Sequence, residues 1–178
     1  MTDDRPKPPY TLIHVDEHLI LKRLDIDEAG ELFELTMKNK KYLDPWMPWM
    51  KDNRTVDDST RFIRDVLDKW GKDHRYGYGM FYDGKLAGHM SLMNLDIEDY
   101  PEIGYWLDHA LNGRGLTTKA VKRLTEFGLD TLGLEKILIK CKPENIASNR
   151  VAEKCGYKLE ATRDYPGRGM MKVWAIEQ

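Results

Sequence analysis

Residues 111–118, LNGRGLTT, join a segment with the pattern of a strand (102–110, EIGYWLDHA) to one with the pattern of a helix (118–133, TKAVKRLTEFGLDTLG). Gly113 and Gly115 form GxG, without the third glycine of a dinucleotide fingerprint or the GxxxxGK[ST] spacing of a P-loop. A tight turn would explain two glycines. Glycines also let backbone N–H groups turn toward a ligand, and the start of a helix presents free donors with a partial positive charge. With Arg114 at its mouth, the loop is a candidate site for phosphate.

The composition is that of an ordinary globular chain. It has 178 residues, 41% hydrophobic and 33% charged, and 28 Lys and Arg against 30 Asp and Glu give a net charge of −2. That balance gives no overall attraction to nucleic acid or to an anionic membrane. The start, MTDDRPKPPY, lacks the apolar core of a signal peptide, and no long uncharged apolar run follows. We expect a cytoplasmic protein with a flexible arm at 1–10, one domain at 11–178, and neither nucleic-acid nor membrane partners.

The cysteines and histidines do not indicate a metal centre. Cys141 and Cys155 are the only cysteines, and both lie in segments that are apolar enough to be buried. We expect two reduced thiols rather than a disulfide. His14 and His18 are four residues apart, but IHVDEH is not an HExxH helix. We therefore predict no metal site.

Hydrophobic periodicity predicts a mixed α/β fold. The expected strands are 11–15 and 19–24 (a first strand or hairpin), 76–82, 85–96, 102–107, 134–141, 157–165 and 170–178. The expected helices are 25–39, 57–72, 118–133 and 145–156, the last closed by Gly156. Asp83-Gly84 is a strong hairpin signal. A helical crossover should make 102–107 and 134–141 parallel within an otherwise mostly antiparallel sheet.

Residues 42–50, YLDPWMPWM, carry apolar mass on backbone that two prolines keep out of a regular helix or central strand. Such a segment either closes the end of a core or lines a binding groove, where rigid aromatic rings and adaptable methionines suit recognition. The sequence leaves both possibilities open.

Residues 102–162 closely resemble the core of the GNAT acyltransferase superfamily, in particular the branch that acetylates protein N-termini, including ribosomal-protein N-acetyltransferases. With 19–36 and 42–50, the resemblance covers nearly the whole chain after residue 10. It implies the GNAT fold, a mixed and mostly antiparallel central sheet with a splayed parallel strand pair and flanking helices. It also implies acetyl-CoA as co-substrate without a metal, and it raises the possibility of a homodimer.

The resemblance assigns a role to the glycine loop. The family pattern Q/R-x-x-G-x-G/A, whose amides hold the pyrophosphate of acetyl-CoA, is matched by the run Asn112, Gly113, Arg114, Gly115, Leu116 and Thr117. Asn112 replaces the usual Gln or Arg, and Thr117 replaces a small residue. Because backbone amides do the binding, both replacements are expected to be tolerated.

A second polar run, 145–150 (NIASNR), opens the predicted helix that ends at Gly156. Asn145 has the position of an N-cap. The resemblance implies that Asn149 hydrogen-bonds the pantetheine arm and that Ser148 lies near the thioester sulfur, with Asn145 also at the cofactor. Capping and chemistry can coexist here.

Acetyl transfer from a thioester needs a neutral amine, a donor for the oxyanion and a way to discharge the thiolate. A thiol has a pKa of roughly 8.5, so the weak acid Ser148 would suffice. An α-amine has a pKa about 2.4 units below that of lysine, which lowers its deprotonation cost by roughly 3.3 kcal/mol. Glu102 is the candidate base, against the alternative of a solvent-facing carboxylate at a strand end. Tyr105 is a weaker candidate, and a backbone N–H near Trp106 or Leu107 is expected to serve the oxyanion.

The acceptor side is less specific. In the family, the connection between the first two helices walls the acceptor groove, which here implicates Tyr42, Trp46 and Trp49, with Tyr105 beside them. Such a groove suits a peptide or protein N-terminus, but also a polyamine or aminoglycoside-type amine. The alternative of a non-catalytic acyl-CoA-binding domain is disfavoured because Ser148, Asn149 and the Gly113/Gly115 loop are all intact. We predict an acetyl-CoA-dependent N-acetyltransferase acting on a protein α-amine such as that of a ribosomal protein.

Overall fold

The computed structural model describes residues 10–97 and 99–178, so the predicted arm, apart from Tyr10, lies outside the described residues. The elements follow the predicted order, except for the short helix α2, which the sequence did not predict. The strands are β1 (Leu12–His14), β2 (Leu19–Arg23), β3 (Arg75–Tyr82), β4 (Lys85–Met93), β5 (Glu102–Leu107), β6 (Lys136–Cys141), β7 (Lys158–Tyr165) and β8 (Gly169–Glu177). The α-helices are α1 (Ala29–Lys38), α2 (Lys40–Leu43), α3 (Val56–Trp70), α4 (Leu116–Glu126) and α5 (Ile146–Lys154).

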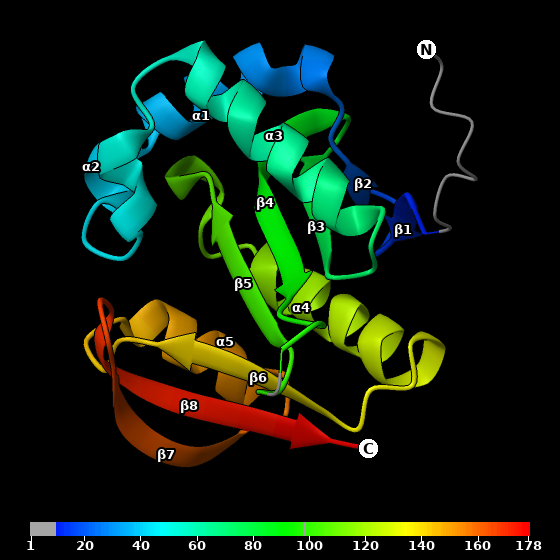
Figure 1. Ribbon diagram of the computed structural model, residues 1–178, viewed down its shortest axis with the longest axis vertical. Coiled ribbons are helices and arrows are strands. Elements are labelled where there is room, and N and C mark those ends of the chain that lie inside the picture. Colours follow the sequence, from blue (N-terminus) through cyan, green and yellow to red (C-terminus); the bar gives the residue numbers. More distant parts are fainter. Residues whose placement is uncertain (1–9, 98) are drawn as a thin grey trace.

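All eight strands join one sheet in the order β1-β2-β3-β4-β5-β6-β8-β7. Figure 1 shows α1, α2 and α3 at one end of the molecule and β6, β7, β8 and α5 at the other, with β4 and β5 between them. The predicted hairpin is confirmed, because Asp83 and Gly84, the two residues between β3 and β4, both have positive φ (48° and 77°).

The two faces of the sheet build two apolar cores, because side chains alternate along each strand. On one face, α4 packs Leu116, Ala120, Val121 and Leu124 in a cluster that includes Met90, Leu92, Ile103 and Leu107. On the other, α1 and α3 pack Ala29, Leu32, Leu35 and Ile63 in a cluster that includes Phe81, Leu86 and Trp106. The central strands are therefore packed on both faces of the sheet.

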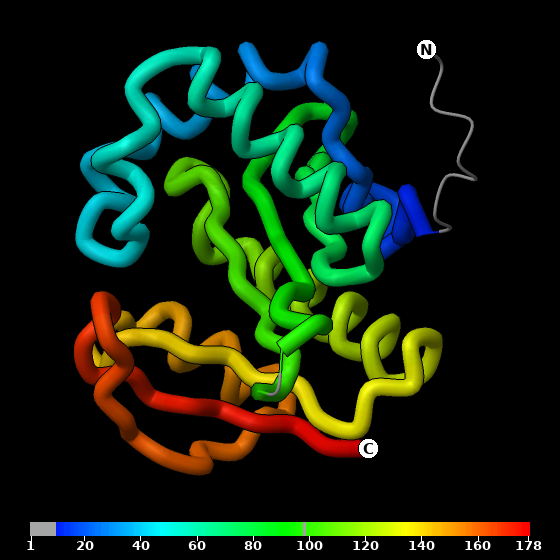
Figure 2. The backbone as a smooth tube through the Cα atoms, in the orientation of Figure 1, coloured from blue at the N-terminus to red at the C-terminus, as the bar shows by residue number. Residues whose placement is uncertain are grey.

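The sheet opens between β5 and β6. This is its parallel pair, as predicted, and its register contains one pair of residues, Glu102 and Leu138. The Leu138 N–H donates to the Pro101 carbonyl at 2.8 Å, after which the two strands run apart (Figures 1 and 2). The expected fold class, with its splayed parallel pair, is confirmed.

The proline-rich segment combines both roles left open by the sequence. The chain makes the short helix α2, turns at Asp44–Met47, and makes a 3-10 turn, η2 (Pro48–Asp52), that begins on a proline. Met50 is fully buried in the core under α1 and α3, whereas Trp49 is 42% exposed. The segment thus closes the core with one face and presents aromatic rings with the other.

Candidate active site

A cleft of about 790 Å³, called the active cleft below, follows the gap between β5 and β6 and extends to α2, α4 and α5. It brings together nearly all the residues singled out in the sequence: Tyr42, Trp46, Trp49, Glu102, Tyr105, Trp106, Leu107, Asn112, Gly113, Gly115, Leu116, Thr117, Asn145 and Ser148. Arg114 and Asn149 do not line it.

The glycine loop forms one lip of the active cleft. Gly113 and Gly115 have φ angles of 80° and 74°, and a Cβ added at either would meet nothing within 4 Å. Glycine is therefore required here by backbone conformation rather than by crowding. Gly115 caps α4, whose first N–H groups have no intrahelical acceptor. The loop has the backbone freedom and the free donors that anion binding requires.

Side-chain contacts tie this loop to the helices opposite. Asn112 donates from Nδ2 to the Tyr42 hydroxyl at 3.1 Å and contacts His109 Nδ1 at 3.1 Å, and the Tyr42 and His109 rings are 4.5 Å apart. The backbone N–H of His109 also donates to Oδ1 of Asn39, the residue that follows α1, at 2.8 Å. These contacts fix the position of the loop relative to α1 and α2.

Ser148 and Tyr105 meet on the α5 side of the cleft. Their hydroxyl oxygens are 2.9 Å apart, and either can donate. Asn145 is the N-cap of α5, as predicted, and its Oδ1 accepts from the Ser148 N–H at 3.2 Å. Burial raises the pKa of Tyr105 above its ordinary value, so this phenol stays protonated at neutral pH. The pair is a polar hydroxyl couple at an otherwise apolar strand edge.

Asn149 is committed to the protein itself. It is 7% exposed, and its Oδ1 accepts from Trp174 Nε1 at 2.9 Å and from Cys141 Sγ at 3.3 Å. Its Nδ2 donates to the carbonyls of Asn145 (2.8 Å) and Lys142 (3.1 Å). These bonds pin the start of α5 to β6 and β8. They use the hydrogen-bonding capacity of the side-chain amide. The pantetheine contact expected of this side chain stays a prediction, and it would require one of these bonds to break.

Glu102 lies at the vertex of the strand gap and is not solvent-facing. It is 4% exposed, and Arg168 holds it with a fork of two hydrogen bonds, Nη2 to Oε1 at 3.1 Å and Nη1 to Oε2 at 3.3 Å. Lys140 Nζ lies 3.5 Å from Oε2 and also donates to Asp99 at 3.0 Å. Burial opposes the charge of Lys140, but its bond to Asp99 and the nearby Glu102 raise its pKa. The alternative of an exposed strand-end carboxylate is wrong.

Strand alternation places the two halves of the site on opposite faces of β5. Glu102 and Trp106 share the face covered by α1 and α3, and Tyr105 lies on the other. The Asp108 N–H donates to Ala87 of β4 at 2.7 Å. By alternation the Trp106 N–H also points toward β4, and the Leu107 N–H points into the gap. Of the two expected oxyanion donors, Leu107 has the suitable direction.

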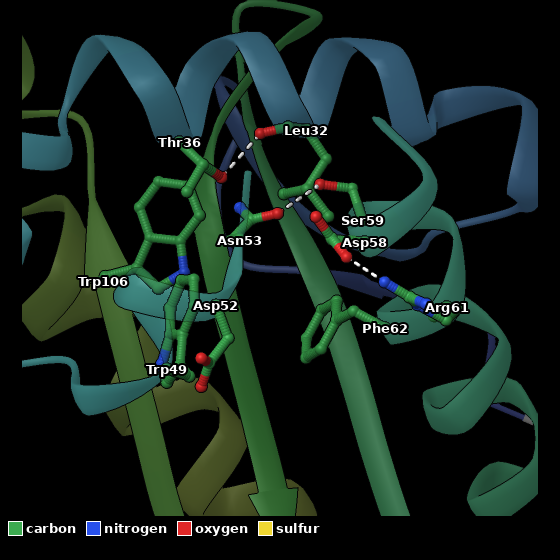
Figure 3. A pocket seen from close by; sticks show the side chains of 10 residues that line it. All are labelled: Leu32, Thr36, Trp49, Asp52, Asn53, Asp58, Ser59, Arg61, Phe62 and Trp106. Atoms are coloured by element: carbon green, nitrogen blue, oxygen red, sulfur yellow. Dashed lines mark hydrogen bonds and ion pairs between the residues drawn. The ribbon is translucent and has the colours of Figure 1, made fainter. Parts of the chain in front are cut away.

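A side cavity of about 290 Å³ adjoins the active cleft and shares Trp49, Phe62 and Trp106 with it. In Figure 3, the two tryptophans lie on one side of this cavity and Phe62 on the other. Leu32 and Thr36 of α1 complete its apolar walls, and its polar lining is Asp52, Asn53, Asp58, Ser59 and Arg61.

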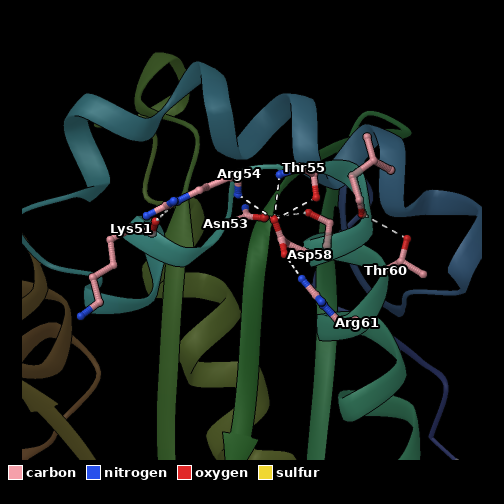
Figure 4. Close-up of polar contacts among 9 residues, drawn as sticks. Lys51, Asn53, Arg54, Thr55, Asp58, Thr60 and Arg61 are labelled. Carbon is pink, nitrogen blue, oxygen red and sulfur yellow. Dashed lines mark hydrogen bonds and ion pairs between the residues drawn. The ribbon is translucent and has the colours of Figure 1, made fainter.

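The N-terminus of α3 holds the rim of this cavity in place. The Asp58 carboxylate accepts from the N–H groups of Arg54 (2.9 Å) and Thr55 (2.8 Å) and from the Thr55 hydroxyl (2.9 Å), and Arg61 pairs with its other oxygen (Figure 4). These donors, the Arg54 N–H foremost, lower the pKa of Asp58 to about 2. The capping box fixes α3, and with it Phe62, against the cleft.

Sequence reasoning missed three residues that line the cleft over β3 and β4, Arg75, His89 and Ser91. They come from β3 and β4, which the sequence marked only as a hairpin. The available signal was polar residues at alternate positions in strands that are otherwise buried on both faces. Burial, and then the charge of Arg75, lower the pKa of His89 to about 3.

The residues described by the structure contain no cluster of three or more His, Cys, Asp or Glu that could hold a metal ion. Cys141 and Cys155 are free and buried. No helix in the described ranges is long and apolar enough to cross a bilayer.

Comparison with known proteins identifies the fold and its chemistry. Residues 18–158 match the family described as acetyltransferase (GNAT) domain. The protein belongs to the GNAT acetyltransferases. It is 30% identical over 151 residues to the candidate ribosomal N-acetyltransferase YdaF of Bacillus subtilis (strain 168), covering 82% of this chain and 81% of that one. It is 27% identical over 149 residues to the ribosomal-protein-serine acetyltransferase of Escherichia coli (strain K12), covering 83% of each. As a GNAT member it is an acyltransferase.

Solved structures give the same result for the fold. RimL, a ribosomal L7/L12 α-N-protein acetyltransferase in complex with coenzyme A, superposes with a TM-score of 0.87 at 23% identity, over 93% of this chain and 97% of that one. The microcin C7 self-immunity acetyltransferase MccE, in complex with acetyl-CoA and AMP, gives 0.88 at 25% identity, over 97% and 98%. The GNAT fold predicted from the sequence is confirmed.

Proposed function

We propose that this GNAT acetyltransferase transfers an acetyl group from acetyl-CoA to the α-amine of a protein N-terminus such as that of a ribosomal protein. The observation that carries the proposal is one continuous cleft running from the glycine loop, past Ser148, to Glu102 at the strand gap and on to the aromatic rings of Trp46 and Trp49. Ribosomal-protein acetyltransferases among its relatives support the choice of acceptor.

The cofactor side fits acetyl-CoA. The glycine loop and the start of α4 supply backbone donors for a pyrophosphate, and the cleft there is also lined by the cations Lys142, Arg150 and Lys154. The free edge of β5 supplies backbone groups for a pantetheine amide, as an unpaired strand edge does for any extended chain. Acetyl-CoA bound in this way would carry the thioester to Ser148.

In the proposed chemistry, Glu102 takes a proton from the α-ammonium group, directly or through a water, and the neutral amine attacks the thioester carbonyl. A β5 backbone N–H that points into the gap near Glu102 donates to the oxyanion, because Leu107 lies five residues, about 16 Å, farther along the strand. The attacking nitrogen loses its remaining extra proton to solvent water, the carbon–sulfur bond breaks, and the thiolate takes a proton from Ser148. Tyr105 is in place to return a proton to Ser148, and water replaces the one that Tyr105 gives up. The products are the acetylated N-terminus and CoA.

Arg168 must yield for this to happen, because its fork occupies both oxygens of Glu102. It lies on the tight turn between β7 and β8, its side chain is 41% exposed, and Gly167 and Gly169 flank it with positive φ. We include in the proposal that the cationic α-amine of the acceptor replaces the guanidinium beside Glu102. Deprotonation then occurs at the carboxylate that attracted the amine.

The testing experiment measures CoA release from acetyl-CoA with peptides that differ at residue one, alongside spermidine and aminoglycosides. Turnover on peptides beginning with Ser or Ala, and not on the small amines, supports the proposal. Turnover on small amines alone would keep the acetyltransferase chemistry and refute the acceptor. Binding of acetyl-CoA without turnover of any amine would favour a non-catalytic domain.

A cytoplasmic location and a single catalytic domain over residues 11–178 belong to the same proposal. A homodimer stays a prediction from the family resemblance.

A further inference from the structure

The active cleft is much more basic than the chain as a whole. Its charged lining consists of six cations and one carboxylate: Arg75, Lys140, Lys142, Arg150, Lys154, Arg168 and Glu102. The whole chain has a net charge of −2, so the positive charge is concentrated at this site. A cleft of this sign attracts anions and repels polycations.

Five of the six cations have an evident function or partner. Lys140 and Arg168 pair with Glu102. Lys142, Arg150 and Lys154 belong to the α5 side, where the phosphates of the proposed cofactor would lie. Arg75 remains. It starts β3, so β4 and β5 separate it from the strand gap, and it belongs to the acceptor side.

Arg75 makes no ion pair with any carboxylate among residues 10–97 and 99–178. Its Nε and Nη2 donate to Ser91 Oγ at 3.1 and 2.9 Å, and its Cζ lies 5.3 Å from the centre of the Phe62 ring. Burial lowers its pKa, and the charge of Asp65, which is ion-paired with Lys69, acts in the opposite direction. A half-buried cation held in place without an ion-pair partner costs the free protein free energy, and a bound anion would offset that cost.

Donor counting leaves hydrogen bonds for such an anion. The guanidinium has five N–H groups, of which two are directed at Ser91. Ser91 Oγ accepts both and retains its own O–H as a donor. Glycines flank Ser91 in register, Gly77 on β3 and Gly104 on β5, and a Cβ at Gly77 would lie 3.2 Å from Ser91 Oγ. Glycine at these two positions leaves room for Val66 and Met93 beside Ser91, because an added Cβ would lie 2.6 Å from Val66 Cγ1 and 2.5 Å from Met93 Cε.

We propose that Arg75 and Ser91 bind a carboxylate of the acceptor, so that the enzyme prefers N-termini with Asp or Glu at the second or third residue. This inference rests on the proposed function and deepens it by defining the substrate class. An Arg fork with a hydroxyl beside it matches the two oxygens of a carboxylate.

Strand register sets the position of the acid. Arg75 pairs with Met93, which pairs with Glu102, and all three lie on one face. Two strand spacings are about 10 Å. An extended peptide advances about 3.3 Å per residue, and the Arg75 side chain reaches Ser91 on β4, the strand next to β5. If the α-amine of the acceptor peptide lies at Glu102, the side chain of its second or third residue lies at Arg75.

His89 does not compete for the anion or add to the charge. It lies two residues before Ser91 on the same face of β4, and the centres of the His89 and Phe62 rings are 5.1 Å apart. With a pKa of about 3, it is neutral at physiological pH. Arg75 and Ser91 are therefore the two side chains that would bind the anion.

The test uses peptides beginning with Ser that differ only in carrying Glu, Gln or Lys at residue two or three, with kcat/KM measured from CoA release. We expect the best Glu peptide to exceed its Gln counterpart about 10-fold and its Lys counterpart by more, equivalent to about 1.4 kcal/mol for the first ratio. Arg75→Gln should reduce the Glu-to-Gln ratio to about one. Its acetyl-CoA affinity should change little.

Controls separate recognition from folding. Arg64→Gln removes an exposed arginine of α3 outside the cleft and should keep the wild-type ratio. If Arg75→Gln unfolds in a thermal melt, Ser91→Ala tests the same ratio, since it removes one donor and the support of the guanidinium. Equal rates on Glu and Gln peptides with wild-type enzyme would overturn the inference and leave the proposed function standing. Turnover of no peptide at all would overturn the proposed function, and the inference with it.

Discussion

The hydroxyl groups of Tyr105 and Ser148 are 2.9 Å apart and join β5 to α5 across the gap where the sheet opens. Tyr105 belongs to the strand whose edge is free, and Ser148 to the first turn of a helix capped by Asn145. Burial keeps Tyr105 protonated, so its hydroxyl can donate to Ser148 and fix the direction of the serine O–H. The pair is therefore suited to deliver a proton to the thiolate.

Replacing Ser148 should therefore affect chemistry more than binding. We expect Ser148→Ala to lower kcat roughly 100-fold, in the range found for general acids, with little change in acetyl-CoA affinity. Tyr105→Phe should lower kcat by a smaller factor, because the serine keeps its own proton. Steady-state kinetics with a Ser-starting peptide and a direct acetyl-CoA titration check both. Thr162→Ala, on an exposed position of β7, serves as the control. Wild-type rates in Ser148→Ala would contradict this assignment.

Glu102→Gln should lower kcat most at low pH. Below about pH 8 the α-amine is mainly protonated and needs a base, whereas above it the amine is increasingly neutral without help. Rates of wild type and variant between pH 6 and 9 should therefore converge as the pH rises. A loss by the same factor at every pH would point to a structural role in holding Lys140 and Arg168. Because removing the charge leaves those cations without their carboxylate, a melting curve must accompany the kinetics.

Local sequence signals predicted much of this architecture. The Asp83-Gly84 turn, the Asn145 cap, the Gly156 stop and the GxG loop each depend on conformations that only a few residue types adopt. They were found because their physical causes lie within a few residues of one another.

What the sequence could not supply are contacts between residues far apart in the chain. Arg168 reaches Glu102 across 66 positions, and Asn112 reaches Tyr42 across 70. Asn149 shows that a local motif can also suggest a ligand contact where the side chain is used within the protein. Its residue type and place in the motif suited a ligand, but Trp174 and Cys141 use its oxygen. Arg75 was overlooked because nothing in its own strand indicates that it lacks a carboxylate partner.

Gly88 should be the glycine that tolerates substitution least. A Cβ there would lie 2.2 Å from the Trp106 carbonyl oxygen, and backbone on the adjacent strand cannot yield as a side chain tip can. Gly88→Ala should destabilise the fold by about 1–3 kcal/mol, as overpacking does, and displace β5 at the gap. Urea unfolding checks the stability. Gly30→Ala is the matched control, since nothing lies within 4 Å of its added Cβ in α1, and it should be neutral or stabilising. Equal effects of the two substitutions would refute the argument.

The Asp58 capping box predicts a dependence of stability on acid. The folded pKa of about 2 is below the ordinary 3.8, so the carboxylate contributes stability above pH 4 that is lost as the pH falls from about 4 to 2. Asp58→Asn should melt several degrees below wild type at pH 7, and the two should approach one another at pH 2.5. A constant difference across this range would show that the charge is not what holds the N-terminus of α3.

His89 predicts a second dependence at higher pH. Its folded pKa of about 3 is below the ordinary 6.5, because burial, and then Arg75, disfavour the charged ring. The neutral side chain therefore supports folding fully above pH 6.5, and this support is lost as the pH falls toward 3. At pH 5 the loss is about 2 kcal/mol, from roughly 1.5 units at 1.36 kcal/mol each. Urea unfolding of wild type and His89→Gln should show a difference of that size appearing between pH 7 and 5, whereas His14→Gln, at an exposed position, should follow wild type. Parallel pH profiles for wild type and His89→Gln would mean that the ring accepts a proton in the folded state, and a charged His89 beside Arg75 would make the acceptor end of the cleft still more basic.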